Sequence, residues 1–373
     1  MIEEKKYDVV VSGYLCVDLA PEFCKTSGES NRADIFMPGS LTEVNDLTIS
    51  LGGVVANTGS ALKIFNQRVL LMGLIGKDLL GEIALKILRE NGLSEGIMTT
   101  DKSGTAYGII LSPPGIDRVF FESSGCSKYF TSSDINYEVV AESRIFHFGY
   151  PPLMKEFYIN NGEELMKMFS IVKTLGVITS LDMTLPDPES ESGKVDWKSI
   201  LTRVLPYVDI FVPSVEEIVS MMKPDFFSQI TTDFTDGDII DSIPEELIYC
   251  IGREIINLGV NVVLIKSGKL GAYLFTGDVS SLNDVPGMTL SEDHWNNREI
   301  RSPAFRIDAT RVKNASGAGD VAVAGFLTAM LKGENPEIAV KYAMCTGRNN
   351  LYGMNATDGL TDWDAMTKEL NIV

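Results

Sequence analysis

Short apolar runs alternate with longer helical segments along most of this chain, and this alternation constrains its fold more than any other feature. The first run, residues 7–11, is rich in valine and ends at Ser12-Gly13, which is typical of a parallel strand covered on both faces. Further strands are predicted at 69–75, 144–148, 177–182, 210–212 and 262–267, and helices at 54–65, 79–90, 163–175, 197–205, 247–258 and 321–331. This order predicts an α/β fold with a doubly wound, mostly parallel sheet flanked by helices.

Two stretches interrupt the alternation and predict a second, smaller sheet. Residues 21–50 and 105–121 carry strand-like runs without helices between them, and the runs 106–112 and 118–121 flank a Pro-Pro-Gly turn, as in a β-hairpin. We therefore expect one domain over residues 1–373, with a small β-sheet lid contributed by about 14–50 and 105–122. The polar, turn-rich segments 185–195, 225–241 and 277–301 are predicted to be surface loops or small insertions.

Composition excludes several classes of function. The chain carries 32 basic and 51 acidic side chains, and the net charge of -19 repels nucleic acids and anionic membranes, so neither is expected as a partner. The five cysteines are an odd, scattered set without C-x-x-C spacing, which indicates neither a disulfide framework nor a zinc site. The two histidines, His147 and His294, lie far apart, which argues against a histidine metal site or a Ser-His-Asp hydrolase.

The sequence also bears on location. No apolar run reaches the roughly 18 to 20 residues that a membrane span needs. The first residues include Glu3 and Glu4 instead of the basic stretch that opens a secretion signal. We therefore expect a cytoplasmic protein.

The segment with the most chemical information is 314–320, which reads Asn-Ala-Ser-Gly-Ala-Gly-Asp and is followed by the apolar helical stretch 321–331. A turn of small residues that opens a helix can present backbone N–H groups to a phosphate at the positive end of the helix. Asp320 would lie beside that anion, where a carboxylate can accept the proton of an attacking hydroxyl. The alternative is close helix-to-strand packing with an aspartate at the helix start.

This segment resembles the D-T-x-G-A-G-D signature of the ribokinase-like (PfkB) carbohydrate kinases, and it lies late in the chain, where that family carries it. The resemblance extends over nearly the whole sequence and implies a ribokinase-like kinase domain that uses ATP and Mg²⁺. It implies that Asp320 is the catalytic base and that Gly317, Ala318 and Gly319 supply the amides of an anion hole.

Two further matches concern the substrate. Asp18, just after the first strand, resembles the aspartate with which family members hold sugar hydroxyls, and Gly52-Gly53 with Asn57 resembles their G-G-x-x-x-N substrate motif. Taken alone, Asp18 could cap a turn or lie in solvent, and the glycine pair with Asn57 could form a tight turn and a helix cap. Their order along the chain favours the reading as a substrate site.

Two matches concern MgATP. Glu217 falls where the family carries N-x-x-E, whose glutamate acts on the magnesium of MgATP through water, but Ser214 replaces the usual asparagine and has a shorter reach. Residues 266–271 resemble the nucleotide loop of the family, which would make Ser267, Gly268 and Gly271 nucleotide-binding residues. The alternative for this loop is a plain β-turn.

Three departures bear on cations and substrate. Asn314 stands where the family signature has an aspartate that contributes to a monovalent-cation site, and the missing charge predicts a weak cation effect. Asp182 lacks the downstream arginine of kinases that act on keto-deoxy-sugar acids, and the lid segments carry no cluster of lysine and arginine. A neutral sugar or nucleoside is therefore favoured over a sugar phosphate.

The sequence thus predicts ATP-dependent phosphorylation of a hydroxyl on a sugar or sugar-like molecule. A nucleoside kinase on the same fold remains an alternative, because specificity resides in lid residues. A sugar- or nucleotide-binding regulator with weakened catalysis is a second alternative, motivated by Ser214 and Asn314. A Rossmann dehydrogenase is disfavoured because no G-x-G-x-x-G follows the first strand. A homodimer through the lid is left open.

Overall fold

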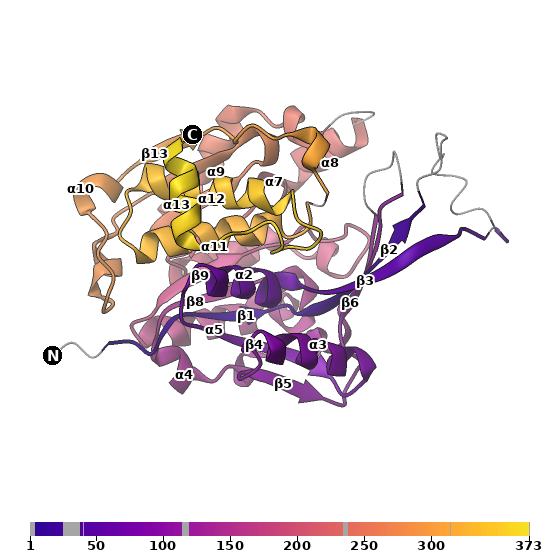
Figure 1. Ribbon diagram of the computed structural model, residues 1–373. Helices are drawn as coiled ribbons and strands as arrows, with labels where there is room; N and C mark the ends of the chain where they lie inside the picture. The colour runs from indigo at the N-terminus through magenta and orange to yellow at the C-terminus, as the bar shows by residue number, and fades with distance from the viewer. Residues whose placement is uncertain are drawn as a thin grey trace.

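A computed structural model of the protein describes residues 4–24, 38–39, 41–113, 119–233, 238–313 and 315–372. Within these residues the main sheet contains nine strands: β1 (Tyr7–Gly13), β4 (Val69–Gly76), β5 (Ile97–Thr100), β8 (Ser143–Gly149), β9 (Ile178–Asp182), β10 (Ile210–Phe211), β11 (Val262–Lys266), β12 (Ala272–Thr276) and β13 (Glu299–Ser302). Their order is β13-β12-β11-β10-β9-β8-β1-β4-β5 (Figure 1). Neighbours from β5 to β11 are parallel, and β12 and β13 pair antiparallel at one edge.

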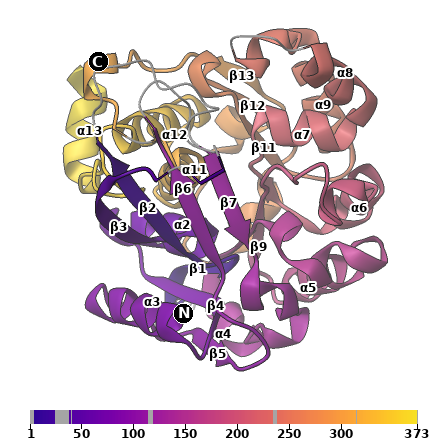
Figure 2. The ribbon, with the colours of Figure 1, turned by 90° about the vertical axis from the view of Figure 1, so that its right-hand side faces the viewer.

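Helices cover both faces of this sheet. One face carries α2 (Gly53–Ile64), α3 (Leu79–Glu90), α10 (Glu292–Trp295), α11 (Ala318–Leu331), α12 (Pro336–Asn350) and α13 (Trp363–Ile372). The other carries α4 (Tyr137–Ala141), α5 (Glu163–Thr174), α6 (Trp197–Val204), α7 (Val215–Met222), α8 (Pro224–Asp233) and α9 (Glu245–Asn257). Figure 2 shows the yellow C-terminal helices grouped on one side, away from α5 and α6. The expected doubly wound α/β fold is confirmed.

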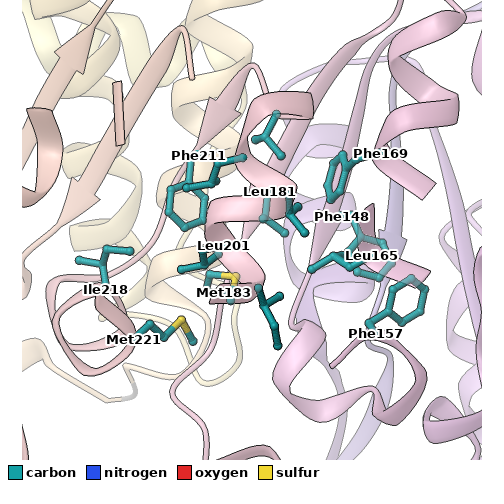
Figure 3. Close-up of a cluster of buried hydrophobic side chains, with 14 of the residues drawn as sticks. Phe148, Phe157, Leu165, Phe169, Leu181, Met183, Leu201, Phe211, Ile218 and Met221 are labelled. Carbon is teal, nitrogen blue, oxygen red and sulfur yellow. The ribbon is translucent and has the colours of Figure 1, made fainter. Parts of the chain in front are cut away.

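Each central strand contributes to two cores, because its side chains alternate between the faces. In β1, Val10 packs into the core under α5 to α9, whereas Val9 and Val11 pack into the core under α2 and α11. Figure 3 shows part of the first core, in which Phe148 of β8 meets Phe169 of α5. Burying a large apolar side chain stabilises the fold by roughly 1.5 to 3 kcal/mol, so strands covered on both faces read as continuous apolar runs.

A second sheet of four strands projects from one side of the molecule (Figures 1 and 2). It contains β2 (Cys16–Phe23), β3 (Val44–Gly52), β6 (Tyr107–Leu111) and β7 (Val119–Ser123) in the order β3-β2-β6-β7. Only two residues separate β1 from β2, so the first strand of the main sheet leads directly into the small one. β6 and β7 pair antiparallel, as the predicted hairpin requires; residues 114–115 of its turn lie outside the described residues.

Two segments predicted as loops contain regular structure. Residues 225–241 hold most of α8, and residues 277–301 hold α10 and most of β13. α8 has no fully buried residue, and β13 is a short edge strand in which only Ser302 is buried. The apolar residues of α8, Phe226, Phe227 and Ile230, are only partly buried and stand among polar residues, so the helix was not predicted from the sequence. Among the described residues no helix is both long and apolar enough to cross a bilayer.

Candidate active site

A cavity of about 450 Å³ opens along the carboxyl ends of the central strands. Tyr150 and Met183, which follow β8 and β9, lie in its lining together with Lys266 at the end of β11. Glu217 of α7 and residues 317–320 at the start of α11 form further walls. Ligands of open α/β sheets bind at this edge, because parallel strands end there together.

The turn before α11 has the conformation that its small residues allow. Gly317 precedes the helix with φ 76°, in the left-handed region that favours glycine, and α11 begins at Ala318. A Cβ on Gly317 would lie 2.6 Å from the Cβ of Ala356, so a larger residue does not fit. Gly319 faces Lys266, whose Nζ would lie 3.5 Å from an added Cβ. Gly317, Ala318 and Gly319 all line the cavity.

Asp320 is 1% exposed and lies in the first turn of α11. Its Oδ2 accepts a hydrogen bond from Asn57 Nδ2 at 2.9 Å, and its Oδ1 accepts one from the Tyr150 hydroxyl at 2.8 Å. Burial raises the pKa of Asp320 to about 6, and the Asp182 carboxylate adds to the rise, which the two hydrogen bonds oppose. Asp320 therefore stays largely ionised at neutral pH but takes up a proton more readily than an ordinary aspartate.

The predicted substrate residues lie on β2, at the end of β3 and in α2, and none of them is among the cavity's lining residues. Asp18 is half-buried on β2, and a Cβ on Gly52 would lie 2.4 Å from its Oδ2, so the glycine makes room for the carboxylate. Burial raises the pKa of Asp18 to about 6. Gly53 opens α2 with φ 81° and packs against the backbone of Tyr14. Asn57 on α2 donates its amide N–H to the Asp320 carboxylate. In this structure Asn57 therefore orients the carboxylate, a role that was not predicted for it.

Glu217 forms a capping box with Ser214 at the start of α7. The Ser214 N–H donates to Glu217 Oε2 at 2.6 Å, and the Ser214 hydroxyl accepts from the Glu217 N–H at 3.3 Å. Desolvation raises the pKa of Glu217 to about 7, although the charge of Lys266 opposes the rise. The serine thus fixes the position of the glutamate, and both residues line the cavity.

The predicted nucleotide loop is a tight turn between β11 and β12. Gly268 and Gly271 line the cavity and have φ of 47° and 97°. A Cβ on Gly271 would lie 2.0 Å from the Ser302 carbonyl oxygen, so glycine is required there. The Ser267 hydroxyl is buried and has no hydrogen-bond partner among the described residues, and Ser267 is not among the cavity's lining residues.

Tyr150 was not identified from the sequence. Lys266 was included only as the first residue of the predicted nucleotide loop, and Asp182 was used only in the argument about the substrate's charge. All three stand at the end of a parallel strand or directly after it, which is the signal that could have identified them. Tyr150 has φ 67°, a conformation that costs a non-glycine residue about 1 to 3 kcal/mol and that concentrates at functional sites.

Glu122 on β7 was also missed. Its Oε1 accepts a hydrogen bond from the Tyr14 hydroxyl. A Cβ on Gly108 would lie 2.8 Å from Glu122 Oε2 and 3.0 Å from Asp18 Oδ1, so the two carboxylates meet over this glycine. The ring of Tyr14 stacks on that of Tyr150 at 6.4 Å between centroids. Nothing in the sequence pairs Glu122 with Asp18, which lies on β2.

Several solved structures of kinases resemble this one. Ribokinase from Arabidopsis thaliana, complexed with ribose and ATP, matches with a TM-score of 0.70 and 18% identity over 98% of each chain. A ribokinase II structure from E. coli in complex with ATP and Mg²⁺ matches with a TM-score of 0.69 and 16% identity over 98% of this chain and 100% of that one. The fold is therefore ribokinase-like.

Sequence comparison defines the family. The pattern of the pfkB family carbohydrate kinases matches residues 26–360, so the chain belongs to this family of phosphotransferases that act on hydroxyl groups. The 5-dehydro-2-deoxygluconokinase of Bacillus licheniformis is 22% identical over 91% of this chain and 88% of its own. Fructokinase-2 of Oryza sativa subsp. japonica is 21% identical over 88% of this chain and 81% of its own.

Replacing Tyr150 by phenylalanine should move the acidic limb of the pH profile of kcat/KM to higher pH by about one unit. The variant loses a hydrogen bond that lowers the pKa of Asp320, so the carboxylate is protonated at a higher pH. Steady-state kinetics between pH 5 and pH 9 measure the shift. Tyr137→Phe is the control, since its hydroxyl donates to the Ser132 carbonyl oxygen, outside the cavity lining. An unchanged limb in Tyr150→Phe would contradict the coupling.

Proposed function

We propose that this chain is a cytoplasmic kinase that transfers the γ-phosphoryl group of ATP to a hydroxyl of an uncharged sugar. The observation that carries the proposal is the buried Asp320 carboxylate, held by Asn57 and Tyr150 at the N-terminus of α11. The five cysteines are free thiols, which fits the reducing cytoplasm.

In this reaction the acceptor hydroxyl gives its proton to Asp320 as its oxygen attacks the γ-phosphorus. The N–H groups of the turn 317–319 point from the start of a 14-residue helix and stabilise the charge on the phosphoryl oxygens. Phosphoryl transfer needs mainly positioning and charge neutralisation, which these groups provide.

Glu217 is suited to hold the magnesium of MgATP through water. Its Oε2 is occupied by the Ser214 N–H, while its Oε1 has no hydrogen-bond partner among the described residues. Hard cations such as Mg²⁺ prefer carboxylate and water oxygens. When bound, the metal neutralises charge on the phosphates, and Glu217 fixes the position of its water shell.

The small sheet supplies the groups that select the acceptor, and we propose that it acts as a lid. Asp18 and Glu122 face each other on it, and the four strands as described contain no lysine or arginine. Carboxylates accept hydrogen bonds from hydroxyls but repel carboxylate and phosphate groups. This favours a neutral acceptor, like that of a fructokinase, over an acid, like that of a 5-dehydro-2-deoxygluconokinase.

We also propose a homodimer through the outer face of this lid. Ile49, Leu19, Ile109 and Phe121 lie in one row across its four strands. Ile49 and Phe121 are 40% and 48% exposed, and exposed apolar groups that line up in this way mark contacts between proteins. Sedimentation velocity of the wild type and of Ile49→Ser measures the association; a monomeric wild type would contradict it.

The potassium response should be weak, because Asn314 offers a neutral amide where the family signature has an aspartate. Asn314 lies outside the described residues, but Asn350 Nδ2 donates to the carbonyl oxygens of Ser316 and Ala356, at 2.9 Å each. The neutral amide of Asn350 thus links the turn before α11 to the loop that follows α12. Rates in KCl and in NaCl should be similar, and strong activation by potassium would contradict this proposal.

Asp320→Asn should lower kcat by about 10² to 10⁴, because the amide cannot accept the hydroxyl proton. The variant should also lose about 1 to 3 kcal/mol of stability, since its NH₂ group faces one of the two donors that now bind the carboxylate. Kinetics and a thermal melt measure both effects. Asp278→Asn, an exposed change outside the cavity lining, should leave kcat unchanged. A folded Asp320→Asn protein with more than about a tenth of wild-type kcat would refute its role as base.

A panel of fructose, ribose, adenosine, fructose 6-phosphate and 5-dehydro-2-deoxygluconate should show kcat/KM about 100-fold higher for a neutral compound than for either anion, since like charges in contact cost several kcal/mol. Coupled ADP release measures the rates. Burial raises the pKa of Glu122 to about 7, so at pH 8 the residue is largely ionised and Glu122→Gln should narrow the difference by removing one of the two repelling charges. A preference for either anion would contradict the assignment of a neutral acceptor, and a preference for adenosine would assign a nucleoside kinase.

A further inference from the structure

Lys266 is the only lysine or arginine that is buried among the described residues, with 8% of its surface exposed. It ends β11, and its side chain lies in the cavity lining. Removing an ammonium group from water is costly unless other charges and hydrogen bonds compensate. The contacts of Lys266 therefore indicate the role of its buried charge.

Among the described residues its one ion pair is with Asp182 at the end of β9, although the charges of Glu217 and Asp320 also act on the ammonium. Lys266 Nζ lies 2.8 Å from Asp182 Oδ1, which also accepts the Met183 N–H at 2.9 Å. Asp182 is 1% exposed, yet its Oδ2 has no hydrogen-bond partner among the described residues. An ammonium has three N–H donors, and this contact uses one of them. The pair is thus left with unused donors and an unused acceptor beside the cavity.

A second lysine and buried aspartate show what a purely structural pair looks like. Asp209 is 2% exposed; its Oδ1 pairs with Lys173, and its Oδ2 accepts the N–H and the hydroxyl of Thr179, each at 2.9 Å. Both carboxylate oxygens are therefore satisfied, and the lysine side chain keeps 41% of its surface in solvent. In the Lys266 pair, by contrast, one carboxylate oxygen has no partner among the described residues, and the lysine is buried.

The unused N–H donors of the ammonium suit an anion, because the ammonium stands against the positive end of a helix. Nζ would lie 3.5 Å from a Cβ on Gly319, so it stands against the turn at the N-terminus of α11. The Lys266 ammonium and the positive N-terminal end of α11 thus face the same position, directly beside Asp320. The group that must lie between the turn and the catalytic base is the phosphoryl group being transferred.

We propose that the ammonium of Lys266 binds the γ-phosphoryl group of ATP and stays against it during transfer to the acceptor. This inference rests on the proposed kinase reaction. A bond forms between the acceptor oxygen and the γ-phosphorus, and the bond to the oxygen bridging to ADP breaks. The hydroxyl proton goes to Asp320, while Lys266 keeps its protons and neutralises charge on the phosphoryl oxygens. Asp182 holds the lysine from behind and is a positioning residue.

Nucleotide affinity tests the contact without any acceptor. Calorimetry with Mg²⁺ should show that Lys266→Met binds the β,γ-imido analogue of ATP about 10- to 100-fold more weakly than the wild type, because one charge-assisted contact is lost. ADP, which lacks the γ-phosphate, should bind both proteins similarly. Equal affinity of both proteins for the analogue would overturn the proposal.

Kinetics separate this role from a structural one. Lys266→Met should lower kcat about 100-fold, as the loss of one transition-state contact does. The double variant Lys266→Met/Asp182→Asn leaves neither member of the pair charged. It should therefore fold even if the single variant Lys266→Met does not. Its kcat should remain low if the ammonium acts on the phosphoryl group. Recovery of wild-type kcat in the double variant would show that the pair is structural and overturn the proposal.

Lys173→Met is the matched control, since it breaks a lysine–aspartate pair outside the cavity lining. It should lower the melting temperature but leave kcat and the analogue affinity unchanged. If the wild type phosphorylates no acceptor, the proposed function fails, whereas the analogue and ADP affinities still decide whether Lys266 contacts the γ-phosphate.

Discussion

The hydrogen bonds to the Asp320 carboxylate join three segments that are far apart in the sequence, and the geometry of the site depends on them. Asn57 on α2 donates to one oxygen, and Tyr150 after β8 donates to the other. The Thr58 hydroxyl donates to the backbone oxygen of Asp320, so α2 holds α11 by two polar contacts. Each such buried contact, if left unmade, costs about 1 to 3 kcal/mol. The carboxylate is therefore fixed beside the small-residue turn at the start of α11.

Charge balance is the second constraint on this site. The carboxylates of Asp182, Glu217 and Asp320 all interact with the single ammonium of Lys266. Burial of this cluster raises the pKa of Glu217 to about 7 and that of Asp320 to about 6, and the charge of Asp182 adds to both rises. Magnesium brought in with ATP would offset the negative charge of Glu217. The arrangement suits a site that binds a cation and a polyanion together.

The small sheet is connected to this cluster through aromatic rings. The Tyr14 hydroxyl binds Glu122, its ring stacks on that of Tyr150, and the Tyr150 hydroxyl binds Asp320. The small sheet and the main sheet are therefore connected by one row of contacts. The absence of a side chain at Gly108 gives Glu122 its place beside Asp18 in this row.

The sequence by itself determined the alternation of strands and helices, the small separate sheet and the turn before Asp320, because each depends on residues close together in the chain. Buried strands such as β1 and β4 read as apolar runs, whereas α8 and β13 contain only partly buried apolar side chains among polar residues and gave a weaker pattern. Only the tertiary structure decided that Asn57 orients Asp320, which lies 263 positions away, and that Lys266 meets Asp182 across 84. Such pairings arise because the sheet order brings the ends of distant strands together, and local periodicity carries no record of that order.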